Sequence, residues 1–148
     1  GSKFELAPNT IIGKNSYMAV YGNGKLKIGE GSNIGMYGMM AAINEIHIGR
    51  NVLFGPNVYI ADYNHCYEDV NMPISKQNLS RGGRIQIGDD SWIGKNVVIV
   101  GNVTIGKHCV IGANSFVNKD IPDYSVAVGN PCKVIKRYEF GINQWVRV

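Results

Sequence analysis

Residues 85–117 read IQIGDDSWIGKNVVIVGNVTIGKHCVIGANSFV. An aliphatic residue returns at every sixth position of this stretch: Ile87, Ile93, Ile99, Ile105, Ile111 and Val117. A fixed six-residue period is typical of a solenoid built as a parallel β-helix. Within each repeat, two inward residues flank one outward residue, which is the alternation of a short strand, and a following glycine permits the turn. The stretch therefore predicts an all-β fold, a hexapeptide-repeat parallel β-helix with three short strands in each coil.

The same period runs upstream through Ile28, Ile34 and Met40, and again through Ile48, Phe54 and Ile60. Ile12-Gly13 is interpreted as an early repeat, although residues 3–27 as a whole are predicted to be the least regular part. One long insertion, residues 61–84, breaks the period, and an insertion of that length is usually functional. We expect a single domain, residues 1–148.

Downstream, Asp120-Ile121-Pro122-Asp123 is predicted to end the coils, because proline cannot donate to a ladder of strands. The tail, residues 133–148, is expected to pack on the body of the molecule or on a neighbouring one.

Composition limits the classes of function. The chain carries a net charge of +4 and contains no apolar run long enough to cross a membrane, so we expect no membrane insertion. Basic residues near the C-terminal end are not interleaved with aromatic ones, which argues against nucleic acid and for a phosphorylated cofactor. The three cysteines have no metal-ligand spacing, which indicates a reduced, cytoplasmic protein.

Outward-facing residues predict the assembly. With three repeats in a coil, residues 18 positions apart stack, so Trp92 lies on Val110 and Val98 on Phe116, whereas Gln86 lies on Thr104. Two outer faces are therefore apolar and one is polar. Exposed apolar faces mark association surfaces, and each subunit of a threefold ring uses two different surfaces. This pattern predicts a homotrimer.

The repeats, together with ADYNHCYEDVNMPI at 61–74 and VGNPCKVIKR at 128–137, resemble the left-handed β-helix hexapeptide acyltransferases. The resemblance covers residues 28–137 and is greatest to the galactoside, maltose and polysaccharide O-acetyltransferases. It implies a left-handed coil, a trimer, acetyl-CoA bound between two subunits, a carbohydrate acceptor and no metal. The helical N-terminal region of the maltose and galactoside enzymes is missing here, which favours a surface-polysaccharide or glycan acceptor.

The resemblance places the catalytic histidine of the family at His65, in the insertion. Its imidazole would take the proton from an acceptor hydroxyl that attacks the thioester directly, and imidazole titrates in the required range. Asp62, Glu68 and Asp69 are candidates to orient this imidazole. His47 and His108 are interpreted as surface or interface residues.

The resemblance also supplies the binding residues. Those predicted to approach coenzyme A are Trp92, Lys95, Ala113, Asn118, Lys119, Lys133 and Lys136. The lysines at 119, 133 and 136 would meet the phosphates as point charges. On the acceptor side the match is Asn44, which is as readily interpreted as a plain turn residue.

Three alternatives remain open at this level. The same base and cosubstrate would serve N-acetylation of an amino sugar. A γ-type carbonic anhydrase shares the fold but needs three histidines around a metal, and its closely spaced histidine pair is absent here. A β-helix without catalysis is the third.

Overall fold

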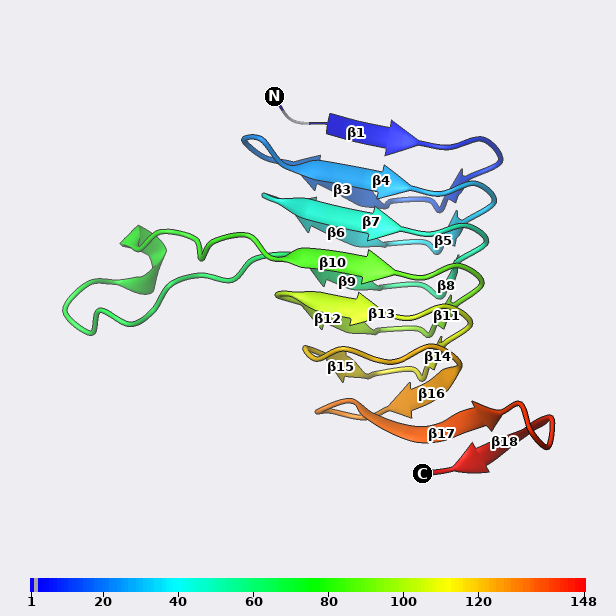
Figure 1. Ribbon diagram of the computed structural model, residues 1–148. Helices are drawn as coiled ribbons and strands as arrows, with labels where there is room; N and C mark the ends of the chain where they lie inside the picture. Colours follow the sequence, from blue (N-terminus) through cyan, green and yellow to red (C-terminus); the bar gives the residue numbers. More distant parts are fainter. Residues whose placement is uncertain (2) are drawn as a thin grey trace.

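The computed structural model describes residue 1 and residues 3–148. The chain winds through three sheets, and most coils contribute one strand to each (Figure 1). Sheet A holds β1 (Lys3–Leu6), β4 (Lys25–Ile28), β7 (Glu45–Ile48), β10 (Arg84–Ile87) and β13 (Val103–Ile105). Sheet C holds β3 (Tyr17–Val20), β6 (Met39–Ala42), β9 (Tyr59–Ala61), β12 (Val98–Val100) and β15 (Phe116–Val117).

Sheet B is the largest of the three. Its parallel strands are β2 (Ile11–Ile12), β5 (Asn33–Ile34), β8 (Leu53–Phe54), β11 (Trp92–Ile93), β14 (Val110–Ile111) and β16 (Ser125–Val128). An antiparallel hairpin, β17 (Lys133–Glu139) and β18 (Gln144–Arg147), extends it at the C-terminal end. We name the edges of the prism after the sheets that meet there: the A–B, B–C and C–A corners.

The coil is left-handed. In Figure 1 the strands of sheet A run from left to right in front, and those of sheet C run from right to left behind them, while the chain descends. The all-β, left-handed parallel β-helix with one long inserted loop is thus the fold of this chain.

Strand register confirms the predicted repeat. Trp92 pairs with Val110, Val98 with Phe116 and Gln86 with Thr104, so the outward residues stack as three hexads per coil require. The inward positions form one continuous core in which Ile46, Ile85 and their neighbours are fully buried. Cys109 is part of this core, and burial raises the pKa of its thiol.

Two kinds of residue make the corners possible. At Gly88 a Cβ would lie 2.5 Å from the backbone nitrogen of Lys107 in the next coil, so only glycine allows the coils to approach this closely. Other corner positions adopt left-handed backbone and carry mainly asparagine, such as Asn51 with a φ of 53°.

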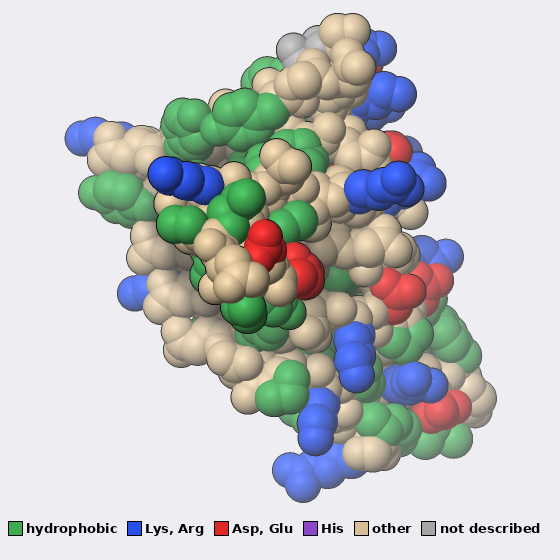
Figure 2. Space-filling view, turned by 90° about the vertical axis from the view of Figure 1, so that its left-hand side faces the viewer, with side chains coloured by type: hydrophobic (Ala, Val, Ile, Leu, Met, Phe, Trp, Pro, Cys, Tyr) green, Lys and Arg blue, Asp and Glu red, His purple; other side chains and the backbone are tan. Residues whose placement is uncertain are grey.

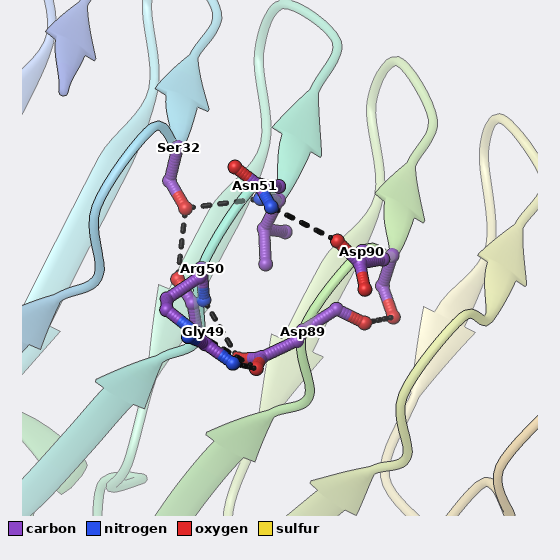
Figure 3. Close-up of polar contacts among 8 residues, drawn as sticks. Ser32, Gly49, Arg50, Asn51, Asp89 and Asp90 are labelled. Carbon is purple, nitrogen blue, oxygen red and sulfur yellow. Dashed lines mark hydrogen bonds and ion pairs between the residues drawn. The ribbon is translucent and has the colours of Figure 1, made fainter. Parts of the chain in front are cut away.

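Polar side chains also link successive coils at the A–B corner, as Figure 3 shows. The Arg50 guanidinium binds Asp89 at 2.9 Å, and the Asn51 amide donates to Asp90 at 3.1 Å. The backbone N–H and then the guanidinium of Arg50 hold the pKa of the Asp89 carboxyl below its usual range.

Two predictions about the ends of the coil are wrong. Residues 3–27 are not irregular, because β1 to β3 form a full coil that pairs with the one below. The coil also does not end at Pro122: Ile121 bridges Ile105, and β16 then pairs with β14. Pro122 ends the pairing along sheet A, and the chain then pairs again in sheet B through β16.

The loop between β9 and β10 leaves the coil at the C–A corner and extends far from it (Figure 1). It comprises residues 62–83 and contains one short 3₁₀ turn, η1 (Ile74–Lys76). No helix in the described part of the chain is long and apolar enough to span a membrane.

Candidate active site

The base of the loop is fixed by a buried carboxylate. Asp62 is fully buried, and its two oxygens accept hydrogen bonds from three consecutive backbone N–H groups, those of Ile43, Asn44 and Glu45, at 2.9, 2.8 and 2.7 Å. Three N–H donors satisfy a carboxylate that would otherwise be costly to bury. The start of the loop is therefore tied to the turn between β6 and β7 in the preceding coil.

The returning arm of the loop is tied to the same turn. The side-chain amide of Asn44 donates to the Gly83 carbonyl at 2.7 Å, and the Gly83 N–H donates to the Asp62 carbonyl at 2.6 Å. A Cβ on Gly82 would overlap the Cβ of Asn44, so glycine is needed for this approach. Asn44 thus has a structural partner here, and its assignment to the acceptor stays a prediction.

His65 lies on a stalk formed by the two arms of the loop. It bridges Leu79, while Cys66 N–H donates to the Asn78 carbonyl at 2.9 Å and Ser80 N–H to the Asn64 carbonyl at 2.8 Å. The backbone of His65 is thereby fixed, and its side chain is exposed. An imidazole held in this way can reach a molecule lying outside the coil.

None of the three candidate carboxylates bonds the His65 imidazole within the described residues. Asp62 is occupied by backbone donors, Glu68 accepts from the N–H of Tyr67, and Asp69 accepts from the N–H of Asn71. Sequence reasoning missed the anchoring role of Asp62. A signal existed, because Asp62 replaces an apolar residue at an inward position directly after a strand.

The residues predicted to meet coenzyme A fall into three groups. Lys95 and Ala113 stack in successive coils at the B–C corner, and Lys133 follows one coil on, where it pairs with Val128. Asn118 and Lys119 come directly after β15, at the C–A corner that also carries the loop.

The third group lies on the outer face of sheet B. Trp92 and Lys136 line a shallow groove together with His108, Val110 and Trp145. Trp92 keeps 51 % of its surface exposed, more than an isolated chain would favour. Within one chain the residues at the B–C corner are separated by the width of sheet C from the loop that carries His65, because that loop leaves the coil at the C–A corner.

The three histidines occupy different parts of the surface. His47 faces outward from β7 between Lys27 and Gln86, and the ring centroid of His108 lies 5.8 Å from that of Tyr124 at the A–B corner. Within the described residues, no three His, Cys, Asp or Glu side chains gather as a metal site would require.

Known proteins share this architecture. Residues 84–119 match the family model for the bacterial transferase hexapeptide, six repeats. A putative lipopolysaccharide biosynthesis O-acetyl transferase from Escherichia coli K12 is 31 % identical over 143 residues, which span 93 % of this chain and 73 % of that protein. The chain belongs to the hexapeptide-repeat acetyltransferase family. Within it, the resemblance to the sugar O-acetyltransferase branch is confirmed.

Two other members of the family are similar to this chain. The galactoside O-acetyltransferase of Lactococcus lactis is 34 % identical, with 90 % of this chain and 62 % of that protein aligned. A hexapeptide-repeat acetyltransferase from Vibrio cholerae, solved with acetyl coenzyme A, superposes with a TM-score of 0.80 at 30 % identity and covers 91 % of this chain and 71 % of that one. Three curated relatives are covered by this chain over 37 %, 73 % and 62 % of their own length.

Proposed function

We propose that this protein is an acetyl-CoA-dependent O-acetyltransferase that modifies a sugar hydroxyl, in a surface polysaccharide or other glycan made in the cytoplasm. The observation that carries the proposal is the exposed His65, held on a clamped stalk in a chain of this family. The names of the relatives support the substrates: they are O-acetyltransferases of lipopolysaccharide and galactosides, and one homologous structure holds acetyl coenzyme A.

In this proposal His65 acts as a general base. Its imidazole takes the proton from the acceptor hydroxyl as the hydroxyl oxygen attacks the thioester carbonyl. The carbon–sulfur bond then breaks, and the imidazolium returns the proton to the departing sulfur. The acetyl group moves from sulfur to oxygen, and free coenzyme A and an acetyl ester leave.

The separation of the predicted residues supports a site shared between subunits. His65 and Lys119 belong to the C–A corner, whereas Lys95, Ala113 and Lys133 belong to the B–C corner. A homotrimer would place the C–A corner of one chain against the B–C corner of the next. The apolar outer face of sheet B, with Leu53 and Trp92, is suited to such a contact.

The test is release of free coenzyme A from acetyl-CoA with a panel of acceptors: galactosides, maltose, amino sugars and deacylated lipopolysaccharide. We expect release of coenzyme A that depends on the sugar. The product should be about 42 Da heavier than the acceptor, because an acetyl group replaces a hydrogen atom. Mild alkali removes an O-acetyl group and leaves an N-acetyl group, so treatment of the product distinguishes the two reactions. Absence of transfer, with bound zinc and hydration of carbon dioxide, would instead favour the carbonic anhydrase alternative.

A further inference from the structure

The N-terminal end of the coil leaves the core open. The residues of the first coil that point inward are Phe4, Leu6, Ile12, Met18 and Val20. We call these five residues the end face. Phe4 and Leu6 expose 49 % and 48 % of their surfaces. The residues directly beneath them in β4, Leu26 and Ile28, are fully buried. In Figure 1, β1 is the uppermost strand, and no described element lies above it.

The opposite end of the coil is closed. Ile121 and Ala127, inward residues of the last turn, are buried, and the β17–β18 hairpin continues past them. The terminal repeats of a solenoid normally carry polar residues on their outer side, because an open end exposes the core to water. Within the described chain, the end face lacks the cover that the C-terminal end has.

The first coil also leaves backbone groups of β1 without a partner strand. In a parallel ladder, successive residues of a strand bond alternately to the neighbour on one side and to the neighbour on the other. The N–H groups of Lys3 and Ala7 both donate to carbonyls of the coil below, at 3.0 Å. The N–H and C=O groups of the alternate residues Phe4 and Leu6 therefore face the open edge, which is a template for a further strand.

The end face lies apart from the surfaces that the proposed trimer would cover. Contacts through the outer faces of sheets B and C place copies side by side and leave the ends of each coil free. Sheet A, to which β1 belongs, is the polar face: Figure 2 shows charged side chains along the right-hand side, where sheet A is, up to the top of the molecule. The end of the coil is therefore open to a molecule that approaches along the coil axis.

The outward side chains of β1 are complementary to themselves. Lys3 and Glu5 flank Phe4 on the outer face and form an ion pair within the strand. An antiparallel copy of β1 centred on Phe4 would place Lys3 opposite Glu5 of the second copy, and Glu5 opposite Lys3 of the second copy. Opposite charges directly across a strand pair stabilise it, and like charges destabilise it. The strand thus carries the complement that a partner would need, which favours a second copy of this chain.

Backbone geometry agrees with the same register. The central residue of such a pair must turn its N–H and C=O groups towards the other strand, and Phe4 does so. The two Phe4 residues would then exchange two hydrogen bonds, with their rings side by side over the core. Lys14, the remaining charged residue of the first coil, is exposed at the B–C corner, away from β1.

We propose that the end face joins two assemblies of this chain end to end. In this contact β1 of each chain pairs antiparallel with β1 of a chain in the second assembly, about a twofold axis through the Phe4 pair. The rotation also brings the apolar residues of one end face against those of the other, so that both cores are covered. Since each trimer offers its end faces in one direction, the product is a dimer of trimers with isologous contacts. The inference goes beyond the proposed function and does not depend on it.

Light scattering over a range of protein concentrations tests the contact. We expect the wild-type mass to rise to twice that of the basal assembly as the concentration increases. Lys3→Glu would set Glu against Glu across the contact, and Glu5→Lys would set Lys against Lys. Each change should therefore weaken the end-to-end contact about tenfold or more at low salt. The control is Lys107→Glu, the same change of charge at an exposed position near the other end of the coil, which should behave as wild type.

A mixture of the two variants gives a result that effects within one chain cannot mimic. Lys3→Glu and Glu5→Lys proteins each repel themselves but present opposite charges to one another, so the doubled mass should return only when they are mixed. Such recovery would support the end face. Loss in both variants without recovery in the mixture would overturn the pairing of β1 with itself. A wild-type mass that never doubles, or a doubled mass that both variants retain, would overturn the end-to-end contact, while release of coenzyme A tests the proposed function separately.

Discussion

Replacing Asp62 should loosen the loop without unfolding the coil. Asp62→Ala removes three hydrogen bonds from backbone N–H groups to a buried carboxylate, each contributing roughly 1.5–3 kcal/mol. The donors belong to partly exposed residues that water can reach once the carboxylate is gone, so we expect a net loss of about 2–4 kcal/mol. For a chain of this length that lowers Tm by roughly 5–15 °C.

Asp62→Asn should cost about half as much, because one amide oxygen can still accept from Asn44 and Glu45 while the amide nitrogen faces the Ile43 N–H. Hydrogen exchange measured by mass spectrometry should show faster exchange at residues 43–45, 64–66 and 78–80, with the coil below the loop unchanged. Asp69→Asn is the control, since that carboxylate accepts a hydrogen bond from the Asn71 N–H within the exposed loop. Exchange and melting equal to wild type in Asp62→Ala would refute the clamp.

Three further predictions concern other parts of the molecule. The pKa of Asp89 is lowered in the folded protein beside Arg50, so its contribution to stability is complete above the ordinary carboxyl pKa and is lost as the pH falls through the lowered value. Asp89→Asn should therefore destabilise the protein by less than about 1 kcal/mol at pH 7 in chemical denaturation, and the difference should shrink as the pH falls below the ordinary carboxyl range. Iodoacetamide on the native protein should label Cys66 well before the buried Cys109, as peptide mapping would show, and equal labelling would contradict the core assignment. Trp92→Asp should shift the mass measured by light scattering from trimer towards monomer, and an unchanged mass would exclude this face from the interface.

The six-residue period was sufficient to predict most of the fold. It sets which residues point inward, and Ile87, Ile93 and Ile99, one from each sheet, are all buried in the core. The errors came where the period is hidden. Near Pro122 the pairing in sheet A stops and the chain pairs again in sheet B. Residues 3–27 keep the period at Leu6, Ile12 and Met18, but among these three glycine follows Ile12 alone, so the repeat is hard to see.

The candidate site was less predictable from the sequence. His65 could be proposed because its motif is local, and the structure adds the stalk that holds it. The inward position of Asp62 was a signal that its carboxylate is buried, but its hydrogen-bond donors lie in a turn 18 residues earlier, which the sequence pattern does not identify. The grouping of Tyr17 and Tyr59 likewise needs the register of β3, β6 and β9, which brings these residues to the same side of one sheet.

The central claim is that His65 performs the proton transfer in an acetyl transfer from acetyl-CoA to a sugar. The most direct measurement is the turnover of coenzyme A release by purified, trimeric His65→Ala with saturating acceptor, beside His47→Ala and His108→Ala as controls. The account predicts a loss of about 10²–10⁴ in kcat for His65→Ala, an unchanged KM for acetyl-CoA, and near wild-type rates for both controls. Wild-type turnover in His65→Ala would contradict it.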